Sequence, residues 1–418
     1  MRTMTKVNLL RLKFANILSF KDEQEIFFTA ESKYTNMPTN YIRNEKAIGE
    51  EMITPVTAFY GANASGKSNI IKILNEIVSS LLNRMDKKPS SDFYQPFALS
   101  EETLNKPSLI EIDFSVEAKR YILSMTFDKE GILSENLVEY AQKTKNILYK
   151  REKDKLVKTD KKIISKFDTV LTETSLEKRK DLLVLDILDT RGLAYIHKIF
   201  EALKEITKTT FANIIATYLN IDDLAEKLYN SPKLLSQVIA FIKYADLGVV
   251  GLKVLKNEPQ SANKYRILFE HKGKDGKLYD MPMNSESTGT NQFAKYLVTF
   301  IPSLLEGGIF VVDELEENLQ PMMLAKLVEM FNVPNINKGR AQLIFTTHDT
   351  SILKSDILKR DEIWFVEKNE EGCSEVYPLT EFKAIREGFN YEKGYLEGRF
   401  GAIPYLGDIK ELEAILNA

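Results

Sequence analysis

The stretch GANASGKS, residues 61–68, constrains the fold of this chain more than any other segment. It matches the pattern G-x-x-x-x-G-K-[ST] at every defined position. An apolar run, MITPVTAFY, ends just before it, and KSNIIKILNEIVSSLL, with apolar residues at helical spacing, overlaps its end. A glycine-containing turn between a strand and a helix is an arrangement that binds phosphate. The sequence therefore predicts an α/β layer with a nucleotide at this turn.

Individual positions of the turn have defined parts in the predicted phosphate site. The glycines let the backbone curl so that its amides point at phosphate oxygens, and the following helix adds partial positive charge. Lys67 is expected to reach the β- and γ-phosphates, and the hydroxyl of Ser68 to bind Mg²⁺. A chance glycine turn is the alternative, which the flanking strand and helix disfavour. The predicted cofactors are ATP and Mg²⁺, and the predicted nucleotide-binding residues are Gly61, Asn63, Ser65, Gly66, Lys67, Ser68 and Asn69.

Two later apolar strands end in residues suited to the same chemistry. GGIFVVDE ends in Asp313, expected to bind Mg²⁺, and Glu314, expected to polarise the attacking water as a general base. LIFTTHD places His348 where a residue that senses the γ-phosphate would stand. Taken alone, an acidic pair after a strand is more often a solvated turn, and a single histidine is more often structural. Together with the phosphate turn they predict a hydrolytic centre whose catalytic residues are Lys67, Glu314 and His348.

Two further segments are weaker candidates. Gln95, in FYQPF, is in the right place to link Mg²⁺ and the attacking water, so it is a candidate metal ligand. Ser287 is a predicted N-cap, and the glycine turn that follows it opens a helix, which is again an anion-binding end. Because the chain already has one phosphate turn, this second one would bind the nucleotide of another copy, unless it is only a well-capped helix. The residues concerned are Ser287, Gly289 and Thr290.

The remaining patterns predict a head interrupted by an insertion. Alternating apolar and polar residues predict strands in 9–14, 108–128 and 132–140. From about residue 141 the sequence becomes lysine-rich and then shows apolar residues at helical spacing, which predicts an inserted, mainly helical subdomain. Strand and helix patterns resume after it and end in an expected hairpin, DEIWFVEKN and SEVYPL. The predicted domains are 1–140, 141–245 and 246–418.

Composition excludes some partners and some chemistry. The net charge of −3 over 418 residues gives no overall attraction to nucleic acid or membranes. The single cysteine, Cys373, excludes an intramolecular disulfide and a thiolate metal cluster. The N-terminus lacks a signal-peptide pattern, and no apolar run reaches the roughly 18 residues that a membrane span needs. We therefore expect a cytoplasmic protein with no membrane partner.

The lysine-rich segment 143–180 leaves nucleic acid as a possible partner. Closely placed lysines can bind a phosphate backbone. Acidic residues such as Glu152, Asp154 and Asp160 interrupt them, however, and aromatic residues are few. A solvated helical face is the favoured interpretation. We expect the insertion to dock a partner or to make contacts with a second copy.

With these elements in order, the chain resembles an ABC/SMC-type ATPase head of the AAA_15/AAA_21 group, related to the RecF, SMC and OLD families. The resemblance implies a mixed sheet with helices plus an antiparallel β subdomain, and a homo-oligomer that is at least a head-to-head dimer through ATP. RLKFANILSF resembles the first strand of such heads, whose Ser19–Lys21 stretch often lies near the adenine. The signature reads STGT rather than LSGGQ, and Gln320 stands where many relatives have histidine. The resemblance assigns Lys67 and Ser68 to Walker A, Ser287–Thr290 to the signature, Asp313 and Glu314 to Walker B, Asn318–Pro321 to the D-loop, and His348 to the switch histidine.

The C-terminal segment NYEKGYLEGRFGAIPYLGD is similar to that of RloA/AbiLi-type ATPases of bacterial antiphage and abortive-infection systems. The shared pattern is Tyr395-Leu396-x-Gly398-x-x-Gly401-Ala402-x-Pro404. About 70 residues follow His348, too few for the nuclease domain that OLD proteins append. The resemblance therefore implies a sensor or scaffold ATPase that controls a separately encoded effector, such as a nuclease. The alternative is a RecF/SMC-like DNA-binding ATPase in repair or genome maintenance.

Overall fold

The computed structural model describes most of the chain. The residues it leaves undescribed are 1–6, 31–41, 44–51, 83–86, 89–90, 118, 142–143, 161–175, 177, 191, 209, 213–220, 246–247, 262, 384, 386–387, 405–415 and 417–418. Everything below refers to the described residues. Among them, no helix is both long and apolar enough to cross a membrane.

A six-stranded sheet contains the three apolar strands that precede the predicted site residues. Its order is β11-β15-β16-β5-β17-β18, and all neighbours are parallel except the β17–β18 hairpin. β5 and β16 are buried along their whole length, as expected of parallel strands covered on both faces. Parallel pairing brings the carboxyl ends of β5, β15 and β16 to one edge. The strands are β5 (Val56–Tyr60), β11 (Thr210–Ala212), β15 (Ile309–Asp313), β16 (Gln342–Thr346), β17 (Ile363–Lys368) and β18 (Ser374–Pro378).

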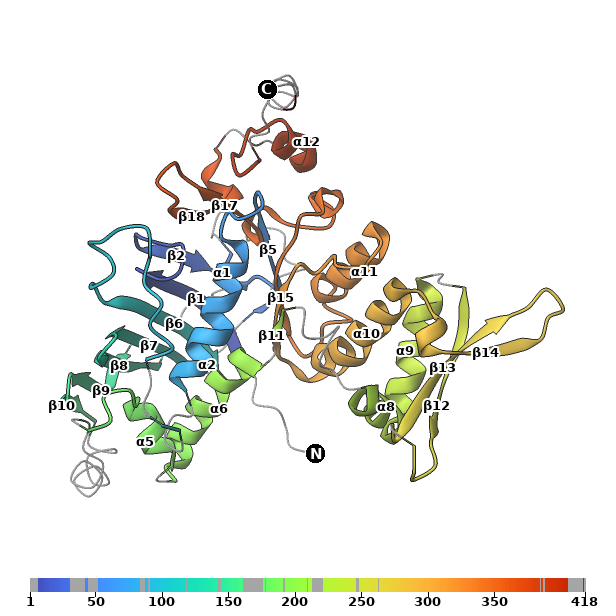
Figure 1. The fold of residues 1–418 in the computed structure, drawn as a ribbon, viewed down its shortest axis with the longest axis horizontal. Coiled ribbons are helices and arrows are strands. Elements are labelled where there is room, and N and C mark those ends of the chain that lie inside the picture. Colours follow the sequence, from blue (N-terminus) through green and yellow to red (C-terminus); the bar gives the residue numbers. More distant parts are fainter. Residues whose placement is uncertain are drawn as a thin grey trace.

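Helices cover both faces of this sheet (Figure 1). On one face lies the helix after the phosphate turn, formed by α1 (Lys67–Lys72), a π-helical turn (Ile73–Ile77) and α2 (Val78–Leu81). On the other face lie α10 (Thr288–Glu306) and α11 (Pro321–Asn332). Successive β15 residues face opposite cores: Val311 packs in the α1 core and Val312 in the α10 core.

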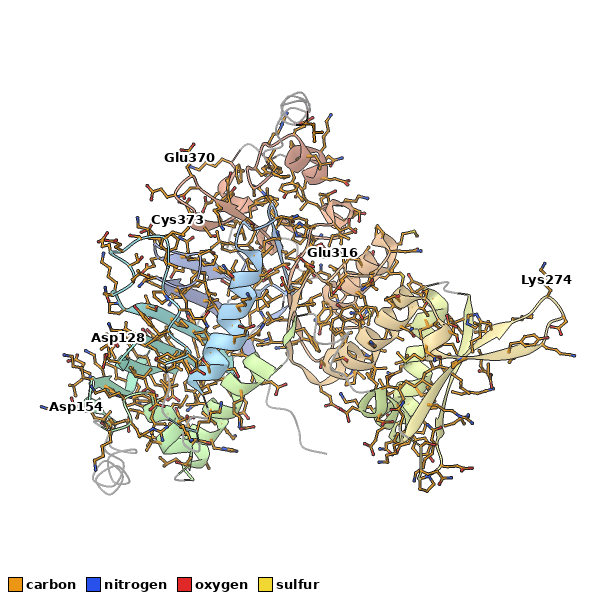
Figure 2. The ribbon with its side chains drawn as sticks, in the orientation of Figure 1. Asp128, Asp154, Lys274, Glu316, Glu370 and Cys373 are labelled. Atoms are coloured by element: carbon orange, nitrogen blue, oxygen red, sulfur yellow. The ribbon has the colours of Figure 1, made fainter. Side chains whose placement is uncertain are left out.

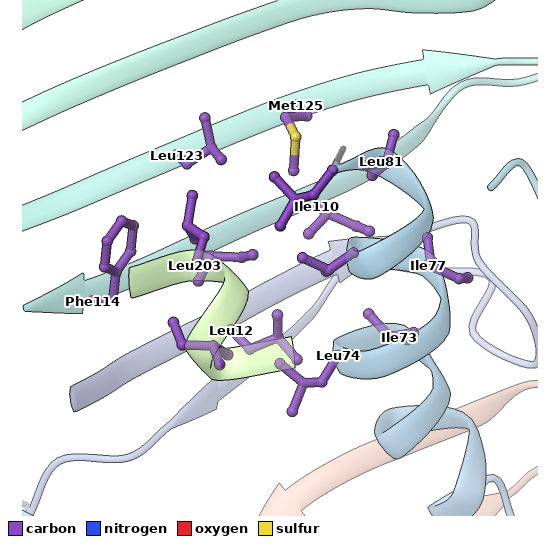
Figure 3. Packing of buried hydrophobic residues seen from close by; sticks show 14 of the residues in the cluster. Leu12, Ile73, Leu74, Ile77, Leu81, Ile110, Phe114, Leu123, Met125 and Leu203 are labelled. Carbon is purple, nitrogen blue, oxygen red and sulfur yellow. The ribbon is translucent and has the colours of Figure 1, made fainter. Parts of the chain in front are cut away.

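A seven-stranded antiparallel sheet packs against α1, α2 and α6 (Ala194–Lys208), in the order β10-β9-β8-β7-β6-β1-β2. β7 alternates buried and partly exposed residues, so one face is apolar. Figure 3 shows this face, with Met125 toward Leu81 of the helix and Leu123 toward Leu203 of α6. The strands are β1 (Val7–Ala15), β2 (Gln24–Phe27), β6 (Ser108–Val116), β7 (Lys119–Asp128), β8 (Gly131–Ala141), β9 (Thr144–Glu152) and β10 (Lys155–Thr159).

The start of the lysine-rich segment differs from the predicted helical face. β9 and β10 extend the antiparallel sheet instead, because Leu148 and Tyr149 are buried in its core while the lysines point outward. Of the rest of 143–180, residues 143, 161–175 and 177 lie outside the described residues. The helices that follow, α5 (Val184–Thr190) and α6, belong to the same core as α1. Removing 141–245 would therefore uncover the core of the head.

The remaining elements form a lobe beside α10 and a C-terminal cap. In the lobe, α8 (Ile221–Asn230) and α9 (Pro232–Tyr244) pack on a three-stranded sheet of β12 (Val249–Lys256), β13 (Tyr265–Lys272) and β14 (Leu278–Pro282), seen on the right of Figure 1. The cap contains the expected β17–β18 hairpin and α12 (Tyr391–Leu396). A further short pair is β3 (Ile42–Arg43) with β4 (Met52–Ile53).

Candidate functional site

The phosphate turn lies between β5 and α1, as predicted, and its glycines are sterically required. Gly66 has a φ of 115°, and a Cβ there would lie 2.4 Å from Ser374 Oγ. A Cβ on Gly61 would lie 2.3 Å from the carbonyl oxygen of Val366. Side chains at these positions would push the turn away from β17 and β18. The phosphate turn therefore packs closely against β17 and β18, and only glycine fits at these two positions.

Lys67 lies inside the turn. Its Nζ donates to the carbonyl oxygens of Gly61 at 2.8 Å and Ala62 at 2.9 Å, and the residue is only 5% exposed. Burial lowers the pKa of Lys67 to about 8, although the nearby carboxylates of Asp313, Glu316 and Glu314 oppose that shift. A buried amine with a lowered pKa gains from an anionic neighbour. The turn is thus prepared for phosphate.

Ser68 and Asp313 meet across the sheet edge. Ser68 Oγ donates to Asp313 Oδ1 at 3.1 Å, and Thr346 Oγ1 donates to the same oxygen at 2.5 Å. A hydroxyl and a carboxylate at hydrogen-bond distance are the oxygen donors that Mg²⁺ prefers, beside the place for phosphates. The residues present therefore fit a Mg²⁺ ion bound by Ser68 and Asp313.

Glu314 and His348 face each other at the end of neighbouring strands. Glu314 Oε1 lies 4.0 Å from His348 Nε2, and both side chains are partly exposed, at 46% and 38%. Glu314 has a φ of 50°, and its N–H donates to Thr346 Oγ1 at 2.8 Å, which aims the side chain away from the strand. Burial and the charge of Lys67 lower the pKa of His348, which favours its neutral imidazole. The pair can accept and donate protons where the γ-phosphate would lie.

The sequence prediction missed three residues that hold this arrangement. Thr346 bonds both Walker B residues, and Glu316 Oε1 accepts the His348 N–H at 2.6 Å. Ser374 Oγ donates to the carbonyl oxygen of Ser65 at 2.6 Å and lies 2.8 Å from Ser19 Oγ. The third acid in DELEE and the paired threonines in FTTHD were available signals for the first two. Nothing local marks Ser374.

Ser19 lies beside the phosphate turn, and its expected place near the adenine stays a prediction. Asn69 Nδ2 donates to Ser19 Oγ at 2.7 Å. The Asn69 side chain therefore bonds the connection between β1 and β2. Asn63 is exposed at the tip of the turn, while Ser65 is buried beneath it. The predicted nucleotide-binding residues of the turn therefore lie together, and their contact with a nucleotide stays a prediction.

Gln95 is not brought to Ser68 or Asp313. Its exposed side-chain amide donates to the Asp92 carbonyl oxygen at 3.3 Å within its own loop. Only its main chain approaches the site, because the Leu18 N–H donates to the Gln95 carbonyl oxygen at 2.7 Å. A metal-ligand role for Gln95 would need a different side-chain conformation from the one observed.

The signature segment lies away from the turn of its own chain. Ser287 is the N-cap of α10, as predicted: its Oγ accepts the Thr290 N–H at 3.0 Å. α1 and α10 lie on opposite sides of β15 (Figure 1), and they pack in different cores. Gly289 instead abuts the D-loop, since a Cβ on it would lie 2.7 Å from the Asn318 carbonyl oxygen. Within one chain, the predicted signature thus packs with the segment after β15 and in a different core from the helix of the phosphate turn.

Comparison with known proteins decides the family. A family model described as "AAA domain, putative AbiEii toxin, Type IV TA system" matches residues 56–354, which include the phosphate turn, Asp313, Glu314 and His348. The chain belongs to this AAA domain family. No curated protein matches the sequence.

Solved structures agree with this AAA assignment at the level of the fold. One is the Smc head bound to the C-terminal winged-helix domain of ScpA, with 15% identity, a TM-score of 0.52, and coverage of 90% of this chain and 99% of that one. Another is a Pyrococcus furiosus Smc head with an extended coiled coil, bound to the C-terminal domain of ScpA, with 15% identity, a TM-score of 0.47, and coverage of 94% and 100%. The first match shows that the head has the SMC-like fold. The chain is therefore a member of this AAA domain family whose fold is that of an SMC head.

The lowered pKa of Lys67 predicts how nucleotide binding depends on pH. Phosphate favours the charged amine, so ATP binding raises the pKa of Lys67 above its free value of about 8. Below that value the amine is protonated in both states and the affinity is constant. Above it, binding takes up a proton, and the Kd rises by about tenfold per pH unit.

Calorimetry with a non-hydrolysable ATP analogue, in two buffers of different ionisation enthalpy, measures the Kd and the number of protons taken up on binding. We expect proton uptake to approach one per site above about pH 8. A constant Kd without proton uptake from about pH 7 to about pH 9.5 would show that the Lys67 amine is not the phosphate ligand.

Proposed function

We propose that this chain binds and hydrolyses Mg-ATP. The observation that carries the proposal is the meeting of Walker A and Walker B through the Ser68–Asp313 hydrogen bond, beside the amine of Lys67 inside the turn. The parallel strands β5, β15 and β16 end at one sheet edge, where the phosphate turn, Asp313 and the segment from Thr346 to His348 meet. That is the place where ligands bind in parallel α/β sheets.

Each residue has a part that follows from its contacts. Bound Mg²⁺ would neutralise charge on the phosphate oxygens and be held by Ser68 and Asp313. Lys67 exchanges its two carbonyl acceptors for phosphate oxygens. Glu314 accepts the proton of the attacking water, and the neutral imidazole of His348 contacts the γ-phosphate. Thr346 keeps the two acids in separate orientations, because it donates to Asp313 and accepts from the Glu314 N–H.

We further propose that two copies close around ATP, so that the Ser287 end of α10 in one copy completes the site of the other. The separation of α10 from α1 within one chain supports this arrangement. The contact between Gly289 and the Asn318 carbonyl supports it too, because it places the exposed Ser287 and Asn318 segments next to each other. The partner that we propose for this site is therefore a second copy of the chain.

The biological role that we propose is a sensor or scaffold subunit of bacterial antiphage defence, which controls a separately encoded effector such as a nuclease. One finding and one resemblance support it. The finding is the family description, which names a putative AbiEii toxin of a type IV TA system. The resemblance is that of the C-terminal pattern to RloA/AbiLi-type ATPases. In the structure this pattern begins in the last two residues of α12 and continues through the turns that follow, where Gly398 and Gly401 have φ values of 75° and 65°. Tyr395 stacks on Phe365 of β17, so the pattern joins the head directly.

A phage-restriction assay tests this role. Cells that express the chain with its neighbouring genes are expected to lower phage plating efficiency by at least about tenfold, and both Lys67→Ala and deletion of the neighbouring effector gene are expected to abolish the effect. Lys72→Ala, on the exposed side of α1, is the matched control and should restrict phage normally. Full restriction by Lys67→Ala would reject an ATP-dependent role. ATP hydrolysis that rises with DNA and falls steeply with salt would instead favour the DNA-maintenance ATPase.

A further inference from the structure

Glu316 has the most enclosed carboxylate among the acids after β15, and the proposed reaction does not use it. Its Oε1 accepts the His348 N–H at 2.6 Å, and the Thr347 hydroxyl bonds the same carboxylate. Its Oε2 is buried and has no partner among the described residues. Figure 2 shows Glu316 near the middle of the molecule, where the central strands end. A buried acid at this place requires an explanation.

At His348 the acceptor of the main-chain N–H changes from a strand carbonyl to a side chain. β16 ends at Thr346, and the Thr347 N–H still donates to the Phe59 carbonyl oxygen at 3.1 Å. His348 is the first residue beyond, and its N–H has the Glu316 carboxylate as acceptor instead of a strand. A hydrogen bond from an N–H to a carboxylate is stronger than one to a neutral carbonyl. Because the imidazole is 38% exposed, packing alone holds it weakly.

We propose that Glu316 is a positioning residue for hydrolysis: by holding the His348 N–H it sets the imidazole at the γ-phosphate. This inference rests on the proposed function of the site. It concerns a residue outside the Walker B pair, and it explains why consecutive residues Thr346, Thr347 and His348 all bond the segment that follows β15. The turn of residues 313–317 and the switch segment are therefore one unit.

The same turn leads to the proposed contact with the second copy. The Leu319 N–H donates to the Glu316 carbonyl oxygen at 2.8 Å, and the neighbouring Asn318 carbonyl abuts Gly289. Glu316 thus stands between the switch histidine and the D-loop. Its main chain shapes the D-loop turn while its side chain fixes His348, so removing only the side chain should leave the turn intact and release the histidine.

Two substitutions of Glu316 test whether its effect on hydrolysis comes from accepting a hydrogen bond or from its negative charge. Glu316→Gln keeps an acceptor for the His348 N–H, and Glu316→Ala removes it. We expect Glu316→Ala to lower kcat at least about tenfold with an unchanged Kd for ATP, and Glu316→Gln to stay within about threefold of wild type, because small misplacements of a reacting group have large effects on rate. Glu317→Ala, the next acid of the same turn, is the matched control and should behave as wild type.

A double-substitution cycle tests whether Glu316 acts through His348. In a His348→Ala background, Glu316→Ala is expected to have no further effect on kcat, because the imidazole it positions is gone. Additive losses would overturn the proposal, as would equal losses for Glu316→Gln and Glu316→Ala. Wild-type kcat in Glu316→Ala, or a weakened ATP affinity in both variants, would overturn it too.

A readout without turnover separates this inference from the proposed function. The chain has three histidines, so ¹³C-labelled imidazole signals are few, and His348→Ala assigns the one of interest. In the nucleotide-free protein, Glu316→Ala should shift the His348 signal and Glu316→Gln should leave it in place. If the signal shifts but wild type does not hydrolyse ATP, the proposed function fails alone. If Glu314→Gln stops hydrolysis while Glu316→Ala changes neither signal nor kcat, only this inference fails.

Discussion

Replacing Glu314 by glutamine is expected to lower ATP turnover by about 10²- to 10⁴-fold while ATP still binds. Glutamine has the size of glutamate but cannot accept the proton of the attacking water. The Glu314 main chain keeps its bond to Thr346, and the phosphate turn with Lys67 is untouched. The variant should therefore collect in the ATP-bound state, with two heads closed on each other.

The measurement combines phosphate release with light scattering after gel filtration in Mg-ATP. We expect the Glu314→Gln protein to elute as a dimer with ATP and as a monomer without it. Glu317→Gln, three residues on in the same turn, is the matched control and should turn over normally. Adding Ser287→Arg to Glu314→Gln should give a monomer that still binds ATP, and its melting curve should show only the roughly 1 kcal/mol expected for a lost helix cap.

Two outcomes would contradict this account in different ways. Wild-type turnover by Glu314→Gln would remove Glu314 from the role of base but leave the phosphate site standing. A Glu314→Gln protein that stays monomeric in ATP at every concentration would reject the shared site, and with it the role of Ser287 and Gly289.

Replacing Glu135 by alanine is expected to destabilise the fold by about 3–5 kcal/mol, because it removes the carboxylate that pairs with the buried, charged guanidinium of Arg151. The side chains of Glu135 and Arg151 are fully buried, and Glu135 Oε2 lies 3.9 Å from Arg151 Nη1. Glu135 also accepts the N–H groups of Val184 at 2.7 Å and Leu185 at 3.1 Å, at the start of α5. One carboxylate thus joins β8, β9 and the first turn of α5.

Denaturant unfolding at pH 7 measures the loss. Glu152→Ala is the matched control: its ion pair with Lys150 is about half exposed on both sides, at 56% and 44%, so its removal should change stability by under about 1 kcal/mol. The double variant Glu135→Leu, Arg151→Met should recover most of the stability, since no charge is then buried. A loss under about 1 kcal/mol for Glu135→Ala would show that α5 is not held in this way.

Much of the site could be predicted because its signals are local. The left-handed Gly66, the strand before it and the helix after it lie within a few residues, and the N-cap bond from Thr290 to Ser287 spans three. Apolar strands followed by Asp313 and His348 indicated parallel strands ending at one edge. Sterics and hydrogen bonds over such short separations depend on the residues alone.

Tertiary structure decided the contacts between distant segments. Ser19 and Ser374 are 355 residues apart and meet behind Gly66. The lysine-rich residues of β9 form a strand because they pair with β8 and because the side chain of Leu148 is buried in the core. Gln95 had the right place in the order of motifs, but its side chain bonds within its own loop.

The sequence by itself determined the phosphate turn, the strands around it and the polar residues at their ends. Only the tertiary structure decided which of those residues touch, that Glu316 accepts the His348 N–H, and that α10, which Ser287 caps, packs in a different core from α1. The physical reason is that backbone conformation is set by neighbours along the chain. Contacts across a sheet depend instead on strand order and on which buried faces pack together, and no single segment encodes these.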